Sequence, residues 1–295
     1  MPPNPKERLD KLLVERGLCA TRSQAQALIM QGKVRLNGQK IDKPGTLVPV
    51  DVPAESLSAD VGLRYVSRGG LKLEKALAVF PVKPAGRLAM DVGASTGGFT
   101  DCLLQNGASA VIAVDVGHSQ FDWGLRHDAR VWLLEKTNIR HLTVEQLQAS
   151  PLPEVALPSL GVVDTSFISL KKVLPALSAL LTPDAEIVAL IKPQFEALDY
   201  IPQKGFDGVV RRLADHQAIL TGVLSDLQTL LPDWSFEGLD VSPITGPKGN
   251  VEFLLHVARG AFQTETLAGA PLTQAVTRVL AQAHAPSRST PESAV

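Results

Sequence analysis

The chain has 295 residues, 45% of them hydrophobic and 20% charged, and only two distant cysteines, which excludes a disulfide framework and a cysteine metal site and gives no reason to expect a metal. No apolar run approaches the roughly 20 residues that cross a bilayer, and Met1 to Leu13 lack a secretory apolar stretch, so we expect a cytoplasmic protein without a membrane partner. The formal charge of -1 hides a basic block, because residues 1–50 carry nine Lys and Arg against four Asp and Glu, which fits either a polyanion partner or a solvated surface.

The first fifty residues predict two short helices followed by a hairpin. Leucines at helical spacing indicate an amphipathic helix over residues 7–16. A second helix can be capped by Thr21 or Ser23 and should end at Gly32. The alternation over Lys33 to Ile41, with an Asn-Gly pair at its centre, predicts a tight hairpin because both central positions favour a positive φ.

This arrangement, with the strings Arg22 to Ala25 and Gly32 to Gly38, resembles the small RNA-binding domain named after ribosomal protein S-four. A DNA-binding helix-turn-helix is the other class, but a hairpin directly after the second helix argues against it. The resemblance implies that basic side chains contact RNA phosphates and grooves, although any one of them taken alone would be an ordinary exposed charge. The candidate RNA-binding residues are Arg8, Arg22, Lys33 and Arg35.

Composition also predicts the domain boundaries. Asp51 to Asp60 is polar, aperiodic and contains proline, which is typical of a linker. We therefore expect an RNA-binding domain and linker over 1–60 and a larger domain over 61–262. Residues 263–295 should form a C-terminal helix and, from Ala285, a polar tail without order.

Beyond Arg87 the chain alternates short apolar strands with helical stretches. Strands separated by helices form a mostly parallel sheet that is covered on both faces. The pattern predicts a doubly wound, Rossmann-like α/β fold of seven strands behind the small α+β domain, with ligands at the carboxyl ends of the strands. The predicted strands are Leu88–Val92, Ala110–Val116, Val131–Leu134, Gly161–Asp164, Ile187–Ile191, Phe236–Val241 and Val251–Val257.

A glycine-rich loop follows the first of these strands, and a helix should begin at about Gly98. The loop lacks the order of a Walker loop and of a dinucleotide fold, which favours a cofactor without phosphates. By itself such a loop is more often a mere tight turn, but the loop and an acid at the right spacing together favour cofactor binding. Asp115 ends the second strand about 20 residues beyond Gly93, where an acid holds a ribose diol. S-adenosylmethionine has a ribose and no phosphate. The candidate cofactor residues are Asp91, Gly93, Ala94, Ser95, Thr96, Gly97 and Asp115.

Four charged residues follow or interrupt apolar elements at the predicted active edge. Lys72 precedes the first strand, while Asp164 and Lys192 end later strands. Glu252 lies within the last predicted strand. A surface ion pair would explain any one of them, but charged side chains among apolar strands must be paired or functional.

The strings Gly93 to Thr100, Ser166 to Leu170, Lys192 to Glu196 and Gly249 to Glu252 resemble the TlyA-type family, and the likeness runs from about residue 6 to 260. Members of that family, often named hemolysins, are ribosomal RNA cytidine 2′-O-methyltransferases with a catalytic domain related to FtsJ-type enzymes. The resemblance implies S-adenosylmethionine as cofactor, ribosomal RNA in a ribosomal subunit as partner, and a catalytic tetrad. That tetrad would be Lys72, Asp164, Lys192 and Glu252.

Such a tetrad serves the attack of a ribose 2′-oxygen on a sulfonium methyl. Lys192 would take the hydroxyl proton or orient the lone pair, Lys72 would supply a second cation, and the two acids would position the lysines. Alignment of the reacting atoms would supply much of the acceleration without a metal. Ala197 to Asp207, beside Lys192, departs from the family pattern, where a shorter and glycine-richer segment is expected.

Two other classes of function are weighed against this one. A secreted hemolysin or membrane-lytic protein needs an export route and a membrane-active segment, and the sequence offers neither. A non-catalytic ribosome-binding factor would be expected to have a degenerate cofactor site, whereas the glycine loop and both lysines are intact.

Overall fold

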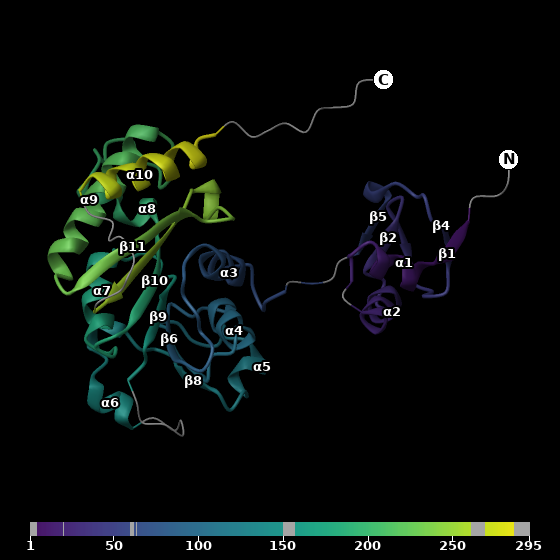
Figure 1. Ribbon diagram of the computed structural model, residues 1–295, viewed down its shortest axis with the longest axis horizontal. Coiled ribbons are helices and arrows are strands. Elements are labelled where there is room, and N and C mark those ends of the chain that lie inside the picture. The colour runs from purple at the N-terminus through teal and green to yellow at the C-terminus, as the bar shows by residue number, and fades with distance from the viewer. Residues whose placement is uncertain are drawn as a thin grey trace. The chain divides into compact units, whose positions relative to one another are not determined.

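The computed structural model describes residues 5–19, 21–59, 62, 64–149, 157–260 and 269–285. The chain divides into two compact units, Met1–Arg64 and Tyr65–Val295, whose elements are labelled in Figure 1. Apart from Ala285, the predicted C-terminal tail lies outside the described residues.

The first unit packs two helices and short strands around a small apolar core. Thr21 caps the second helix, since its side chain accepts a hydrogen bond from the Gln24 backbone N–H at 3.2 Å. Asn37 and Gly38 have φ values of 50° and 77°, so the hairpin turn is the one that the sequence predicts. The elements are β1 (Lys6–Arg8), α1 (Leu9–Glu15), α2 (Arg22–Met30), β2 (Val34–Leu36), β3 (Gln39–Ile41), β4 (Leu47–Pro49), η1 (Ala54–Ser56) and β5 (Leu57–Ala59).

Strand β5 corrects the predicted linker. It pairs antiparallel with β2, with Leu57 opposite Leu36 and Ala59 opposite Val34. The Leu57 side chain is buried in the core of the first unit. The prediction of a linker over the whole of 51–60 was therefore wrong for residues 57–59, which belong to the small domain.

The second unit is built on a seven-stranded sheet in the order β11-β12-β10-β9-β6-β7-β8. Neighbouring strands from β10 to β8 are parallel, whereas β12 runs antiparallel to both β10 and β11. The predicted doubly wound, mostly parallel sheet is thus confirmed. Its strands are β6 (Leu88–Val92), β7 (Ala110–Val114), β8 (Val131–Leu134), β9 (Leu160–Val163), β10 (Glu186–Ile191), β11 (Trp234–Val241) and β12 (Phe253–Arg259).

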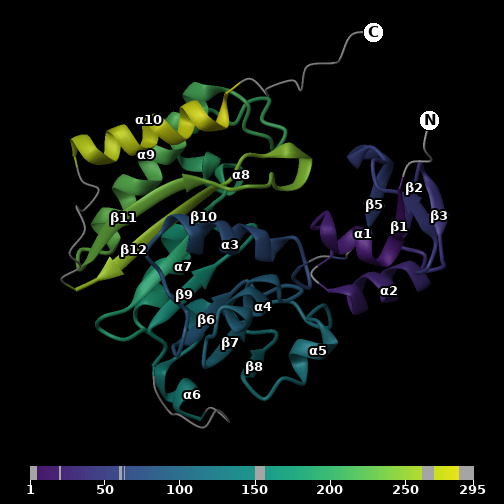
Figure 2. The ribbon, with the colours of Figure 1, turned by 45° about the vertical axis from the view of Figure 1, so that its right-hand side comes forward.

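Helices cover both faces of this sheet. Figures 1 and 2 show α7, α9 and α10 on one face and α3 and α4 on the other. Alternate side chains of a strand point to opposite faces of the sheet. Met90 and Val92 of β6 belong to the hydrophobic core under α7, α9 and α10, and Ala89 belongs to the core under α3 and α4. The helices are α3 (Gly69–Val79), α4 (Gly98–Gln105), α5 (Trp123–Arg126), α6 (Val144–Gln148), α7 (Leu170–Ser178), α8 (Pro193–Glu196), α9 (Leu213–Leu230) and α10 (Ala270–Ala283), with 3-10 turns η2 (Ile139–His141), η3 (Ala197–Asp199) and η4 (Pro247–Gly249).

The strand order reverses between β6 and β9. From β6 the chain adds β7 and β8 on one side, and it then returns to place β9 on the other side. Gly93 follows β6 and Asp164 follows β9, and the two lie so close that a Cβ on Gly93 would be 2.9 Å from the Asp164 carbonyl oxygen. Such a switch point is where open α/β sheets form a ligand crevice.

Candidate functional site

The four predicted tetrad residues meet at the carboxyl edge of the sheet. Lys192 directly follows β10, and Asp164 directly follows β9. Lys72 lies in the first turn of α3. Glu252 precedes β12 instead of lying inside a strand as predicted, and because Ile191 pairs with Phe253 in an antiparallel register, it arrives beside Lys192.

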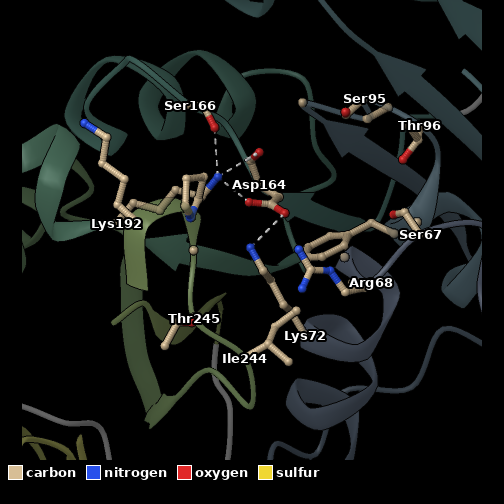
Figure 3. Close-up of a pocket in the computed structure, with 18 residues that line it drawn as sticks. Ser67, Arg68, Lys72, Ser95, Thr96, Asp164, Ser166, Lys192, Ile244 and Thr245 are labelled. Carbon is tan, nitrogen blue, oxygen red and sulfur yellow. Dashed lines mark hydrogen bonds and ion pairs between the residues drawn. The ribbon is translucent and has the colours of Figure 1, made fainter. Parts of the chain in front are cut away.

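Ion pairs connect the four side chains in the order Lys192, Asp164, Lys72 and Glu252. Lys192 Nζ lies 2.6 Å from Asp164 Oδ1, and Lys72 Nζ lies 3.5 Å from Asp164 Oδ2 and 2.6 Å from Glu252 Oε2. Figure 3 shows the Asp164 carboxylate between the two lysine amines. Both lysines and Glu252 are buried, so each charge has its counter-charge within the site.

The two acids keep Lys72 in its charged form. Burial lowers the pKa of this lysine, but the negative charges of Asp164 and Glu252 and their hydrogen bonds raise it by more, so the net shift is upward. A cation therefore sits beside the Asp164 carboxylate that also pairs with Lys192.

Ser166 is a polar partner of the tetrad that the sequence did not single out as a site residue. Lys192 Nζ donates a hydrogen bond to Ser166 Oγ at 3.0 Å and lies 3.4 Å from the Asp164 carbonyl oxygen. The signal that points to it is its place two residues after Asp164, in the loop that leaves β9. Ser166 thus helps to fix the direction of the Lys192 amine.

The glycine-rich loop is shaped by contacts within the protein. Gly93 and Gly97 have φ values of 85° and 96°, which favour glycine, and a Cβ on Gly97 would lie 2.6 Å from a Leu125 methyl carbon. Asp115 ties the loop to β7, since its Oδ2 accepts from the Ser95 N–H at 2.7 Å and its Oδ1 accepts from the Gly117 N–H at 2.6 Å. Each of these oxygens retains a second lone pair for a ligand hydroxyl.

Two cavities adjoin this loop. One of about 620 Å³ contains the Lys72, Asp164 and Lys192 side chains, and the other, of about 520 Å³, is lined by Asp115 and by apolar side chains. Both are lined by Gly93 and Asp164, so they meet at the switch point. Each volume is typical of a site for a small ligand.

Five of the predicted cofactor residues border the cavities. Gly93 and Ser95 border both, Ala94 and Thr96 border the first, and Asp115 borders the second. Neither cavity is lined by the other two, Asp91 and Gly97. Asp91 is fully buried on β6, where its Oδ2 accepts a hydrogen bond from Thr100 Oγ1 at 2.7 Å.

The first unit brings two of its predicted RNA-binding residues to one buried acid. Asp10 is 0% exposed and accepts hydrogen bonds from Arg8 Nη2 at 2.9 Å and from Arg22 Nε at 3.1 Å. The hydrogen bond from Arg8, those from Gln26 and Arg22, and the Arg22 charge hold the pKa of Asp10 well below its usual range in spite of burial. Arg8 and Arg22 remain exposed, as do Lys33 and Arg35 on the hairpin side.

Segment 197–207, which the sequence predicts to depart from the family pattern, forms polar contacts with the helices beside it. Tyr200 donates a hydrogen bond from its hydroxyl to Asp226 Oδ2 at 2.6 Å, and Lys171 Nζ lies 2.7 Å from Asp199 Oδ2. These contacts join the segment to α7 and α9.

Comparison with known proteins assigns the family. A model of the FtsJ-like methyltransferases matches residues 65–259, and a model of the S4 domain matches residues 7–52. The chain belongs to the FtsJ-like methyltransferase family. It is therefore a methyltransferase, and the resemblance of the first unit to the S-four RNA-binding domain is confirmed.

Relatives of this FtsJ-like protein align along most of its length. It is 44% identical over 250 residues to the 16S/23S rRNA (cytidine-2′-O)-methyltransferase TlyA of Mycobacterium tuberculosis, covering 85% of this chain and 89% of that protein. It is 47% identical over 252 residues to YqxC of Bacillus subtilis, named as a candidate rRNA methyltransferase, with 85% of each chain covered. A solved structure described as a candidate hemolysin from Streptococcus thermophilus matches with a TM-score of 0.67 and 42% identity, covering 95% of this chain and 96% of that one.

The name hemolysin, printed for the Streptococcus thermophilus structure, denotes a protein that lyses membranes. Among the described residues, no helix is both long and apolar enough to cross a bilayer.

Proposed function

We propose that this FtsJ-like protein uses S-adenosylmethionine to methylate the ribose 2′-hydroxyl of a cytidine in ribosomal RNA. The observation that carries the proposal is the paired chain of Lys192, Asp164, Lys72 and Glu252 at the point where two cavities meet. The printed name of the Mycobacterium tuberculosis relative supports the ribosomal substrate and the 2′-oxygen.

The second cavity fits the proposed cofactor. Among the described residues that line it, the charged ones are two acids, Asp115 and Asp164, and none is basic, which suits a ligand with positive charge on its sulfur and amino group. Asp115 would accept hydrogen bonds from the ribose diol, and apolar side chains such as Val116 and Ile139 would contact the base. S-adenosylmethionine, when bound, supplies a methyl group on a positively charged sulfur that leaves as a neutral thioether.

The tetrad prepares the acceptor oxygen. A ribose hydroxyl is a weak nucleophile. Lys192, which lines the first cavity, takes the hydroxyl proton when its amine is neutral, or donates a hydrogen bond that orients the lone pairs of the oxygen when it is an ammonium. Asp164 stabilises a proton that arrives on Lys192 Nζ, since the two lie 2.6 Å apart, and Ser166 fixes the direction of that amine. The proton leaves the oxygen as the bond from oxygen to methyl carbon forms.

Lys72 and Glu252 set the charge balance around Asp164. A charged Lys72 attracts the Asp164 carboxylate at the oxygen that Lys192 does not contact, and so weakens the hold of that carboxylate on the Lys192 amine. Buried Glu252 keeps Lys72 in place at 2.6 Å. In this account Lys192 contacts the substrate, and Asp164, Lys72 and Glu252 position the Lys192 amine.

The two domains divide the work. Residues 1–60 bind structured RNA through Arg8, Arg22, Lys33 and Arg35, and residues 61–262 hold the cofactor and perform the chemistry. The substrate places the enzyme in the cytoplasm, where ribosomal subunits are assembled. The target nucleotide would be exposed or turned out of its helix to reach the tetrad.

The test is transfer of radiolabelled methyl groups to purified small and large ribosomal subunits, with the methylated position located by resistance to alkaline cleavage. A 2′-O-methyl group blocks that cleavage because the neighbouring hydroxyl is no longer free to attack the phosphate. We expect label in RNA and a resistant bond at a cytidine. Label on a base, with every bond still cleaved, would overturn the assignment to the ribose.

A further inference from the structure

The cavity lined by Lys72, Asp164 and Lys192 has an excess of positive charge. Among the described residues that line it, Asp164 supplies the one carboxylate, and this acid already pairs with two lysines. Two further basic residues line the cavity without an ion pair to an acid among the residues described. The four basic lining residues are Arg68, Lys72, Lys192 and Lys248.

Arg68 stands at the start of α3, one turn before Lys72. Its side chain is exposed, and Figure 3 shows the guanidinium directed into the cavity beside Lys72 and Asp164. Within the described ranges of the chain, no residue forms an ion pair with it or accepts a hydrogen bond from it. A guanidinium whose N–H groups are not engaged by an acid can form a bidentate hydrogen-bonded pair with an anion such as a phosphate.

Lys248 lies in the turn between β11 and β12 and is likewise exposed. Its φ of 57° is unusual for a residue with a side chain and costs conformational energy. Asn250, 3% exposed, holds the turn: its Nδ2 donates to the Pro247 oxygen at 3.2 Å and to the Gly208 oxygen at 3.0 Å. A strained but anchored turn thus presents a lysine that has no ionic partner among the residues described.

We propose that Arg68 and Lys248 bind the phosphates on the two sides of the target nucleotide and thereby hold its ribose over Lys192. The inference rests on the proposed function, since only a nucleic-acid acceptor brings a phosphate on each side of the reacting sugar. Among the described residues, none that lines the second cavity is basic, so of the two cavities the one lined by Lys72 and Lys192 attracts phosphate. The two residues would position any nucleotide, because phosphates carry no sequence information.

The experiment compares Arg68→Gln, Lys248→Gln and the double variant with the wild-type full chain in steady-state methyl transfer to ribosomal subunits at several salt concentrations. Each single change should raise KM for the subunit roughly tenfold, as expected for loss of a charge-assisted hydrogen bond. The slope of log(kcat/KM) against log salt should fall by about 0.7 to 1 per lost contact. Arg68→Lys and Lys248→Arg should restore most of the loss.

Lys83→Gln is the matched control. Lys83 is exposed and precedes β6, so it lies at the opposite edge of the sheet from the site. Loss of one positive charge at Lys83 should leave both KM for the subunit and the salt slope equal to those of the wild type.

Cofactor binding, measured by calorimetry, separates the possible failures. Unchanged cofactor affinity with raised KM supports the proposal. Weakened cofactor affinity in both variants would overturn it, because the residues would then bind the cofactor's carboxylate. Unchanged KM and salt slope, with an active wild type, would overturn it while leaving the proposed function intact. A wild-type protein that labels neither subunit would instead refute the proposed function, and this inference with it.

Discussion

Lys72 owes its charge to two acids, and this dependence gives a prediction at the scale of single residues. Burial lowers the pKa of Lys72, and the charges of Asp164 and Glu252 raise it by more. In Glu252→Gln one of those charges is gone, so Lys72 should lose its proton at a lower pH than in the wild type. We expect kcat to fall about 100-fold, as for a misplaced catalytic group, and its alkaline limb to move to lower pH. A pH profile of kcat that coincides with the wild type would contradict the role of Glu252.

Asp91 supplies a second prediction, on stability. Burial raises its pKa to about 7, although the hydrogen bond from Thr100 opposes this shift, and its Oδ1 has no hydrogen-bond partner among the described residues. Because the folded state holds the proton more tightly than the unfolded state, the free energy of unfolding should fall as pH rises from about 4 to 7. The loss is roughly 4 kcal/mol at most. Asp91→Asn should abolish this slope in denaturant titrations, and parallel curves for the two proteins would refute it.

The four candidate residues stand out in the sequence because each is a charged side chain that precedes, follows or interrupts an apolar element, and the resemblance to the TlyA-type family implies that they act as a tetrad. Ser166 was missed because a serine in a polar loop gives no comparable signal. Asp10 was missed because its burial depends on how α1 packs against α2, which no local pattern shows. Asp91 was predicted at the cofactor from its place in the loop, whereas side-chain alternation turns it toward α4 and Thr100.

At the scale of elements, the contact between α3 and α4 sets the position of Lys72. A Cβ on Gly98, the first residue of α4, would lie 2.2 Å from Ser67 Oγ and 2.9 Å from the Gly70 backbone nitrogen of α3. Gly98→Ala should therefore displace α3, lower the free energy of unfolding by about 1–3 kcal/mol and reduce turnover. Thermal or denaturant unfolding and methyl-transfer rates measure the two effects, and a variant equal to the wild type in both would contradict this view of the interface.

The strands were predicted well because each parallel strand is a short apolar run bounded by turns. The antiparallel direction of β12 was not predicted, since an apolar run gives the same signal in both orientations. The antiparallel course of β12 decides that Glu252, ahead of the strand, reaches the edge where the other strands end. Strand β5 escaped prediction because its three residues lie in a polar, proline-containing stretch and, unlike β2 and β3, are not joined to their partner strand by a tight turn.

At the scale of the whole molecule, we expect most of the RNA affinity to come from the first unit and the chemistry to take place in the second. Lys33 tests this division, since it is exposed and, within the described part of the chain, has no ionic partner. Lys33→Gln should weaken binding to ribosomal subunits and lower the salt slope by about 1, while cofactor affinity stays unchanged. Arg22→Gln is a less selective change, because it also removes a partner of buried Asp10. Equal subunit affinity for Lys33→Gln and the wild type, measured by filter binding, would remove Lys33 from the interface.

The most direct test of the central claim is single-turnover methyl transfer to ribosomal subunits by Lys192→Ala, with cofactor affinity measured on the same preparation. If Lys192 acts on the 2′-hydroxyl, transfer should fall by at least about 100-fold while the dissociation constant for S-adenosylmethionine hardly changes. Transfer at a rate comparable to the wild type would contradict the account and remove Lys192 from the mechanism.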